Sequence, residues 1–254
     1  MIQVFNKGGI MEQRFVDNMR SGAKELGIEL TDVQIGQFYK YYELLTEWNK
    51  VMNLTAITEL DEVVSKHFLD SLALVKAVPR MGEKAERVID VGTGAGFPGI
   101  PLKIAFPKLQ MTLLDSLNKR IGFLNEVIGQ LGLQSVETIH GRAEDFGRNP
   151  KYREQYDYCV SRAVANTATL SEYCLPFVKV GGCFVPYKSG KIDEELAEGT
   201  KAIESMGGSI ENVVWFTLMV GEGERSLVVI KKGKATPKKF PRKAGVPAKE
   251  PIKK

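Results

Sequence analysis

The sequence predicts an α/β protein of the Rossmann-like, doubly wound class, with a mostly parallel seven-stranded sheet preceded by a helical region. From Arg87 onward, short apolar segments alternate with helical segments, which is typical of a parallel sheet covered on both faces. Near the C-terminus, two apolar segments are joined by the short Gly-rich link Val220-Gly-Glu-Gly-Glu224. A link this short permits an antiparallel hairpin but no crossover, so the sheet is expected to end in such a hairpin.

The residues before this sheet are expected to form two parts. Residues 1–10 show neither the basic nor the apolar stretch of a signal peptide and are interpreted as a leader, with Met11 as an alternative start. Residues 11–86 are expected to be helical, and one helix face in them is expected to pack against the main domain. That face carries Ile35, Phe38, Tyr39, Tyr42, Leu45 and Trp48. His67 and Asp70, three residues apart, share a helix face, where a structural hydrogen bond and a role at a pocket are both open.

The main domain is expected to span residues 87–233. Its strands are expected at 88–91, 111–115, 136–140, 156–161, 181–188, 212–219 and 225–232, and its helices near 99–106, 118–131, 168–178 and 191–206. At 254 residues the chain is long enough for this one large domain and an appendage.

Composition excludes several classes of protein. With 43% hydrophobic residues and no run of about twenty apolar ones, the chain is expected to be soluble and to have no membrane partner. Its three cysteines, Cys159, Cys174 and Cys183, lack the spacing of metal ligands, so no metal, no disulfide framework and a cytoplasmic location are expected. No apolar stripe suggests a subunit interface, which favours a monomer.

The charge of the chain is concentrated in a C-terminal tail, residues 234–254. Between Lys231 and Lys254 there are ten basic residues and one acid, Glu250, which gives this stretch about +9. The net charge of the whole chain is +4, so the rest carries about −5. A basic tail on an acidic body suggests a polyanionic partner, and a solvated tail without a partner is an equal alternative.

The strongest functional signal is the segment Arg87–Leu102, RVIDVGTGAGFPGIPL. Four glycines fall within eight positions directly after a short apolar strand. Gly92, Gly94 and Gly96 permit positive φ angles and a close approach of the backbone to a ligand, and the prolines that follow suit the start of a helix. Such a turn is typical of a nucleotide-like cofactor site, whereas a plain connection needs only one glycine.

The identity of that cofactor depends on two acids. The spacing Gly94-x-Gly96-x-x-Gly99 also matches the dinucleotide pattern, with Asp115 about twenty residues further on. Asp90 favours S-adenosylmethionine, because a carboxylate stabilises an ammonium and a sulfonium but is a poor neighbour for a pyrophosphate. The order Asp-Val-Gly-x-Gly-x-Gly is the form seen in methyltransferases that use this cofactor. Asp115 ends the next strand, where an acid accepts hydrogen bonds from a ribose diol in either class.

Further site residues are expected beyond the carboxyl ends of the strands, where such sheets bind ligands. After the third strand, Glu144 or Asp145 is placed to accept the adenine amino group, and a favourable helix N-terminal acid is the alternative interpretation. After the fourth strand, Arg162 is expected to point into the cleft without a compensating charge. Lys188, a second cation, closes the following strand, and Arg162 and Lys188 are the candidate catalytic residues.

Taken together, these residues resemble the RsmG, or GidB, family of guanine-N7 methyltransferases of small-subunit (16S) ribosomal RNA. The resemblance covers nearly all of the chain after Met11, including Trp48–Thr55, His67–Ser71, Asp90–Pro101, Leu114–Arg120, Gly141–Glu144 and Ser161–Ala163. Residues 236–251 resemble an extension found in one branch of that family. The resemblance implies 16S rRNA or the small ribosomal subunit as partner. It also implies S-adenosylmethionine bound by Gly92, Phe97, Ala143, Glu144 and Arg162, with Asp115 at the ribose by analogy to the wider fold.

The motifs that follow the fourth strand restrict the chemistry. The sequence there has no Asn- or Asp-Pro-Pro-aromatic element for an exocyclic amine, and no Pro-Cys or Thr-Cys nucleophile for carbon methylation. A ring nitrogen carries an in-plane lone pair and needs neither, so catalysis is expected to consist of alignment and proximity. Two alternatives remain: an NAD(P)-dependent oxidoreductase, from the dinucleotide spacing, and a noncatalytic ribosome-binding factor, from the basic tail.

Overall fold

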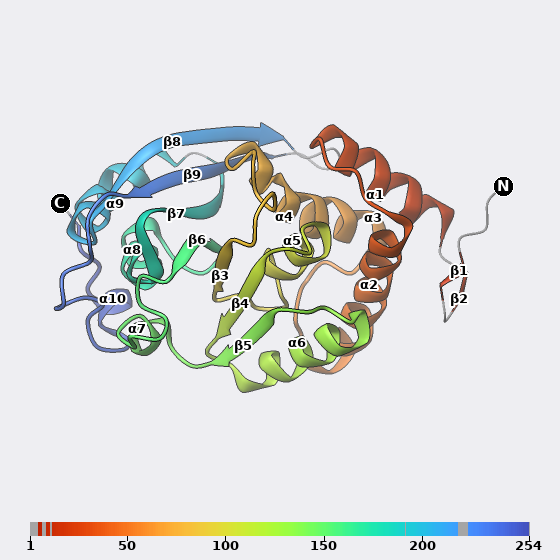
Figure 1. Ribbon diagram of the computed structural model, residues 1–254, viewed down its shortest axis with the longest axis horizontal. Helices are drawn as coiled ribbons and strands as arrows, with labels where there is room; N and C mark the ends of the chain where they lie inside the picture. Colours follow the sequence, from red (N-terminus) through yellow and green to blue (C-terminus); the bar gives the residue numbers. More distant parts are fainter. Residues whose placement is uncertain (1–4, 7–8, 11, 191, 218–222, 254) are drawn as a thin grey trace.

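The centre of the protein is a seven-stranded sheet, seen in a computed structural model that describes residues 5–6, 9–10, 12–190, 192–217 and 223–253 (Figure 1). The sheet order is β5-β4-β3-β6-β7-β9-β8. Its strands are β3 (Arg87–Val91), β4 (Gln110–Asp115), β5 (Val136–His140), β6 (Tyr156–Arg162), β7 (Val178–Ser189), β8 (Gly208–Thr217) and β9 (Glu224–Lys232). Strands β3 to β7 run parallel, and β9 pairs antiparallel with both β7 and β8. The predicted fold class, with its C-terminal hairpin, is confirmed.

The largest differences from the predicted strands lie at two N-terminal ends. β7 begins at Val178 rather than at 181, and β8 begins at Gly208 rather than at 212. The residues added to β8 begin with Gly208, and those added to β7 are followed by Gly181 and Gly182, and glycine weakens the sequence signal of a strand. The predicted strand end at 218–219, positions 220–222 of the link, position 191 and Met11 lie outside the described residues.

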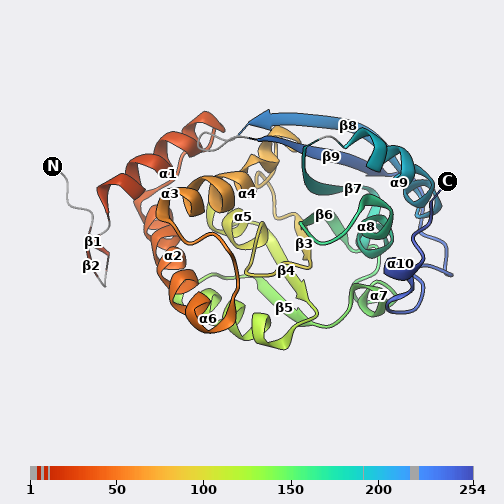
Figure 2. The ribbon, with the colours of Figure 1, turned by 180° about the vertical axis from the view of Figure 1, so that it is seen from behind.

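Helices cover both faces of the sheet (Figures 1 and 2). Because successive side chains of a strand point to opposite faces, Val88 lies in a first hydrophobic core and Ile89 in a second. The first core is covered by α5 (Gly99–Ala105) and α6 (Asn118–Leu131), and the second by α8 (Thr167–Cys174) and α9 (Asp193–Ser205). The short elements α7 (Ala143–Phe146), η3 (Leu175–Phe177) and α10 (Val246–Lys249) also lie on the second side, around α8.

The N-terminal helices complete the first core, as predicted. They are α1 (Gln13–Glu25), α2 (Asp32–Met52), α3 (Leu60–Val63), the π-helix η1 (Val64–Leu69), α4 (Asp70–Leu72) and η2 (Ala73–Lys76), preceded by the short pair β1 (Phe5–Asn6) and β2 (Gly9–Ile10). Thr31 and Gln34 form a capping box that begins α2. The aromatic face of α2 packs inward, but its most buried tyrosine is Tyr41, while Tyr39 and Tyr42 are only partly buried.

The C-terminal tail packs against the second core. Phe240 is buried there, and Thr236 Oγ1 donates a hydrogen bond to Met206 O at 2.9 Å. The guanidinium of Arg242 makes a two-pronged contact with Glu172 of α8, with Nε to Oε1 at 3.0 Å and Nη2 to Oε2 at 2.8 Å. The described part of the tail is therefore a packed element of the domain rather than a solvated extension.

Candidate cofactor and substrate site

The glycine-rich turn after β3 has the backbone that the sequence predicts. Gly92, Gly94 and Gly96 have φ angles of 72°, 62° and 99°. A Cβ atom on Gly92 would lie 2.6 Å from the Val164 side chain, and one on Gly96 would lie 2.7 Å from Tyr41 Oη. A Cβ atom on Gly94 would meet no atom within 4 Å. The first and third glycines therefore serve internal packing, and Gly94 borders open space where a ligand can approach the backbone.

Asp90 lies buried behind this turn with one oxygen unsatisfied. Its Oδ2 atom accepts hydrogen bonds from Thr93 Oγ1 at 2.7 Å and from Gly99 N at 2.9 Å. Its Oδ1 atom has no hydrogen-bond partner among the described residues. Burial raises the pKa of Asp90 to about 7, against the hydrogen bonds from Thr93 and Gly99 that lower it. A buried carboxylate with a free oxygen is unfavourable by itself, so this side chain suits a cationic ligand.

Asp115 at the end of β4 ties the next strand to the same turn. Its Oδ2 atom accepts from Gly94 N at 2.9 Å, and its Oδ1 atom accepts from Leu117 N at 2.9 Å. Arg120 Nη1 lies 3.3 Å from Oδ2. A carboxylate has about four acceptor positions, so Asp115 retains capacity for a ligand hydroxyl while it fixes the turn.

Ala143 and Glu144 begin α7, beyond the end of β5. The Glu144 side chain is buried, and its Oε1 atom accepts a hydrogen bond from Gly245 N of the tail at 2.7 Å. Asp145, the alternative candidate, is exposed. The structure thus brings the tail into contact with a residue that was predicted to hold the adenine.

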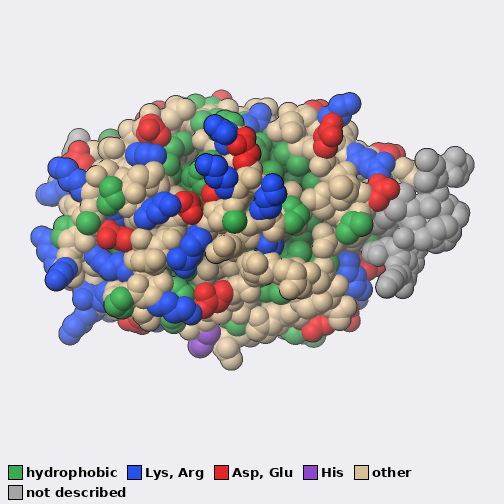
Figure 3. Space-filling view, viewed as in Figure 1, with side chains coloured by type: hydrophobic (Ala, Val, Ile, Leu, Met, Phe, Trp, Pro, Cys, Tyr) green, Lys and Arg blue, Asp and Glu red, His purple; other side chains and the backbone are tan. Residues whose placement is uncertain are grey.

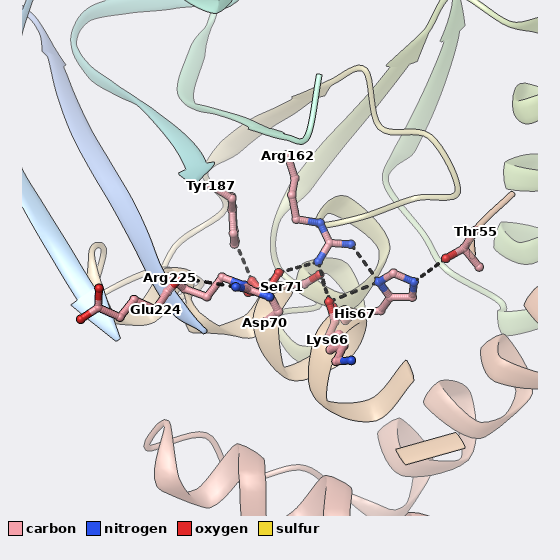
Figure 4. A network of polar contacts seen from close by, with 9 residues as sticks. All are labelled: Thr55, Lys66, His67, Asp70, Ser71, Arg162, Tyr187, Glu224 and Arg225. Carbon is pink, nitrogen blue, oxygen red and sulfur yellow. Dashed lines mark hydrogen bonds and ion pairs between the residues drawn. The ribbon is translucent and has the colours of Figure 1, made fainter. Parts of the chain in front are cut away.

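Arg162 at the end of β6 is not an uncompensated cation, and that expectation is wrong. Its Nη1 atom donates to Asp70 Oδ2 at 2.6 Å and to Lys66 O at 3.1 Å (Figure 4). The guanidinium also lies over the Phe97 ring, 5.1 Å from the ring centroid. The sequence pattern missed the ion pair because Asp70 lies 92 residues earlier, in the N-terminal helices.

His67 joins the same network, so both members of the His67–Asp70 pair contact Arg162 and line the same pocket. Its ring stacks on Phe97 with centroids 4.5 Å apart. Its Nδ1 atom lies 3.2 Å from Lys66 O and 3.4 Å from Arg162 Nη2, and its Nε2 atom lies 2.8 Å from Thr55 Oγ1. Burial and the Arg162 charge lower the pKa of His67 to about 3, so the ring is neutral at physiological pH.

Lys188 at the end of β7 is also paired, which corrects the expectation of a second free cation. Its Nζ atom donates to Glu195 Oε1 at 2.6 Å and to Ala165 O at 3.1 Å. Glu195 lies in the first turn of α9. Both predicted cations therefore stand at the carboxyl ends of neighbouring strands, each neutralised by an acid from a helix.

Arg162 and Lys188 line a pocket of about 390 Å³. Its wall includes Ile57, His67 and Asp70 from the N-terminal helices and their connections, and Phe216 and Ser226 from the hairpin. Two buried polar atoms at this wall, Asp70 Oδ1 and Ser226 Oγ, lack a hydrogen-bond partner in the part of the chain that the structure describes. Arg225 Nε approaches Asp70 Oδ1 only to 3.8 Å.

Several residues of the site were missed by sequence reasoning. Tyr41 donates a hydrogen bond to Ala95 O inside the glycine-rich turn, Thr55 orients His67, and Glu195 anchors Lys188. Tyr41 could have been found, because it follows Phe38 by three positions on the helix face already identified. Thr55 and Glu195 carry no local signal, since only the fold brings them to the strand ends.

Two negative findings apply to the described residues. None of their helices is long and apolar enough to cross a membrane. No group of three or more His, Cys, Asp or Glu side chains among them is arranged to hold a metal ion, and the three cysteines are free and buried.

Known proteins with a similar fold include S-adenosylmethionine-binding ones. A mutant of MtNAS in complex with S-adenosylmethionine aligns with a TM-score of 0.52 at 14% identity, over 88% of this chain and 100% of that one. The fibrillarin pre-rRNA processing protein of Methanococcus jannaschii aligns with a TM-score of 0.50 at 16% identity, over 65% of this chain and 76% of that one. At these identities the likeness shows the fold alone.

Sequence comparison is more specific. The family model described as rRNA small subunit methyltransferase G matches residues 34–228. A ribosomal RNA small subunit methyltransferase G from Lachnoclostridium phytofermentans is 55% identical over 231 residues, which are 91% of this chain and 95% of the relative. Its counterpart from Alkaliphilus oremlandii is 53% identical over 237 residues, 93% of this chain and 98% of the relative. With the fold, the glycine-rich turn and this extent of identity in agreement, the chain belongs to the rRNA small subunit methyltransferase G family.

Proposed function

We propose that this protein transfers the methyl group of S-adenosylmethionine to N7 of a guanosine in small-subunit (16S) ribosomal RNA. The observation that carries the proposal is the turn after β3, where Gly94 borders open space beside the buried, half-satisfied carboxylate of Asp90. That combination suits a cofactor with an exposed cationic end, and the family supplies the class of substrate. The ribosome as substrate implies a cytoplasmic site of action, and a monomer is the expected form.

The residues proposed to hold the cofactor are spread over four strand ends. They are Asp90 in β3 and Gly92, Gly94, Gly96 and Phe97 after it, Asp115 at the end of β4, Ala143 and Glu144 after β5, and Arg162 at the end of β6. Asp90 is assigned to the cationic end and Asp115 to the ribose hydroxyls. Glu144 is assigned to the adenine, with Oε1 already held by the tail. Arg162 is assigned to the boundary between cofactor and substrate, where it holds Phe97 from one side and Asp70 from the other.

The proposed catalysis requires alignment rather than proton transfer. Bound S-adenosylmethionine supplies the electrophilic methyl group. N7 of guanine has its own lone pair, so no residue of the chain has to act as a base, in keeping with the lowered pKa of His67, about 3, which makes this ring a weak base. In A-form RNA the deep, narrow major groove hides N7, so the target base has to lie in a loop or be turned outward. Arg162 and Lys188, each engaged with an acid, keep the walls of the pocket in place.

No observation favours either alternative, the NAD(P)-dependent oxidoreductase or the noncatalytic ribosome-binding factor. An oxidoreductase would place a pyrophosphate beside Asp90, and the buried carboxylate opposes this. The basic tail, which motivated a noncatalytic binding factor, is packed against a predicted cofactor residue.

Two measurements test the proposal. By titration calorimetry, S-adenosylhomocysteine is expected to bind and NADH is not; binding of NADH alone would refute the cofactor. Asp90→Ala is expected to weaken this binding by about 1–3 kcal/mol, with little change in RNA affinity.

Mass spectrometry of rRNA nucleosides from a deletion strain is expected to show one 7-methylguanosine missing from 16S rRNA. An unchanged set of nucleosides would refute the methyltransferase and favour the binding factor.

A further inference from the structure

The pocket beside Arg162 is separate from the glycine-rich turn and has the features of a base-binding site. Its volume of about 390 Å³ falls within the range of about 300–1,000 Å³ typical of ligand pockets. Half-buried Ile57 and Phe216 supply apolar wall on which a flat ring can pack. Enzymes that modify a base commonly turn it out of its stack into such a pocket and read its hydrogen-bonding edge there.

The cations of this pocket are poorly placed to read guanine. Arg162 is engaged with Asp70 and Lys66 O, and Lys188 with Glu195 and Ala165 O. A guanidinium that binds O6 and N7 together would also block the nitrogen that has to be methylated. Recognition through another edge of the base avoids this conflict.

Glu195 lies in the pocket wall, and hydrogen bonds orient its carboxylate. Within the described part of the chain, its Oε1 atom accepts three hydrogen bonds, from Thr167 N, Thr167 Oγ1 and Lys188 Nζ, each at 2.6 Å. Its Oε2 atom takes part in none of them, and the side chain is 34% exposed. Burial raises the pKa of Glu195, but hydrogen bonds from Lys188 and Thr167 outweigh it and hold the pKa below its ordinary value. At neutral pH the group is therefore a pure acceptor whose orientation is fixed by three donors.

We infer that Glu195 selects the target base by accepting a hydrogen bond from the 2-amino group of guanine at Oε2. This inference rests on the proposed function. The 2-amino group lies on the Watson–Crick edge, across the ring from N7, so recognition leaves the reacting lone pair free. Adenine has no amino group at that position and is rejected, because the carboxylate would lose water without gaining a partner. Glu195 is thus a specificity-determining residue, and Lys188 and Thr167 position it.

The test compares two RNA substrates, small-subunit rRNA with guanosine or with inosine at the methylated position. Inosine keeps N7, O6 and N1–H and lacks only the 2-amino group. Wild-type enzyme is expected to prefer guanosine by about 10- to 100-fold in kcat/KM, the usual worth of a hydrogen bond to a charged group. Glu195→Gln keeps one oxygen for Thr167 and Lys188 and replaces the other by an amide nitrogen. It is expected to methylate both RNAs at similar, low rates, with unchanged affinity for S-adenosylhomocysteine.

The matched control is Glu198→Gln, the same chemical change on the same helix at an exposed residue that pairs with Lys253. It is expected to retain the wild-type preference for guanosine. Equal rates of the wild-type enzyme on the two RNAs, or a wild-type preference retained by Glu195→Gln, would overturn the role of Glu195. Absence of methylation by wild-type enzyme on either RNA would overturn the proposed function itself, so the two failures are distinguishable.

Discussion

The two regions that flank the methyltransferase domain are attached to it in different ways. The N-terminal helices share the first hydrophobic core and reach the cleft through the buried pair Asp70–Arg162. The tail adds one buried aromatic residue, Phe240, to the second core and contacts α7 and α8 through polar groups, including that of Gly245 with Glu144. The N-terminal helices are thus part of the first hydrophobic core, whereas the tail is held on the outside of the domain mainly by polar contacts. Loss of the first should disrupt the fold, and loss of the second should mainly loosen one end of the site.

The largest expected effect is that of Asp70→Ala. The Asp70 and Arg162 side chains are 6% and 14% exposed, so this change leaves a nearly buried guanidinium without its counter-charge. The free energy of unfolding is expected to fall by about 3–5 kcal/mol in urea denaturation. Lys40→Ala, which removes one partner of an exposed pair with Glu43 in the same region, should change it by less than about 1 kcal/mol. Equal effects of the two variants would contradict the assignment of the N-terminal helices to the core.

The next largest expected effect is that of pH on the free energy of unfolding, through His67 and Asp90. The pKa of His67 is about 3 in the folded protein against 6.5 ordinarily, so the stability that neutral His67 contributes is lost as the pH falls from 6.5 toward 3. The pKa of Asp90 is raised from 3.8 to about 7, so its contribution has the opposite sign: it is full below 3.8 and is lost as the pH rises toward 7. Each slope is about 1.4 kcal/mol per pH unit, and the two offset each other between about pH 4 and 6.5.

His67→Gln should therefore gain stability relative to wild type, by that slope, as the pH is lowered from 6.5 to 4. Asp90→Asn should lose stability relative to wild type over the same range. Urea denaturation at pH 4.5, 5.5 and 6.5 measures both. Removal of the tail should leave the pH dependence unchanged, and a tail variant that altered it would show that the two regions are coupled.

Arg242→Ala tests the contact between the tail and α8. It leaves the carboxylate of Glu172, which is 1% exposed, without its two-pronged partner, so the free energy of unfolding is expected to fall by about 1.5–3 kcal/mol. Because the tail also holds Glu144, calorimetry should show S-adenosylhomocysteine binding weakened by about 3- to 10-fold, or about 0.6–1.4 kcal/mol. The exposed neighbour Lys243→Ala should stay within about 0.5 kcal/mol of wild type. Full cofactor affinity in Arg242→Ala would show that the tail does not support the site.

The smallest effect on stability is expected from the exposed lysines of the tail. Lys and Arg side chains gather at the end of the molecule that carries α7, α8 and α10 (Figure 3). Replacing Lys238 and Lys243 together by Ala should leave stability unchanged but reduce the salt dependence of rRNA binding, by about 0.7–0.9 in the log–log slope for each lost phosphate contact. Replacing Lys24 and Lys50, two exposed lysines of the N-terminal helices, should not alter the slope. An equal change of the slope in both double variants would contradict preferential binding of the RNA at the tail.

Local pattern accounts for what the sequence could predict. The strands, the glycine-rich turn and the acids at the strand ends are readable because period, glycine spacing and strand termini are properties of neighbouring residues. The partners of Arg162 and Lys188 were not readable, since Asp70 and Glu195 meet them only after helices from two regions have packed. The many lysines of the tail predicted a solvent-exposed segment, so its packing on the domain was not predicted. That packing depends on the apolar Phe240 and on the positive φ of Gly245.

The contact between Gly245 and Glu144 also sets an order of events during synthesis. Glu144 is translated 101 residues before its partner. At about 5–20 residues per second, α7 is made roughly 5–20 s before Gly245, and β6 to β9 are made in between. Over that interval the nascent chain completes the strands of its sheet, yet Glu144 still lacks the backbone donor that holds its side chain. The contact that supports the proposed adenine site is therefore among the last that the growing chain can form.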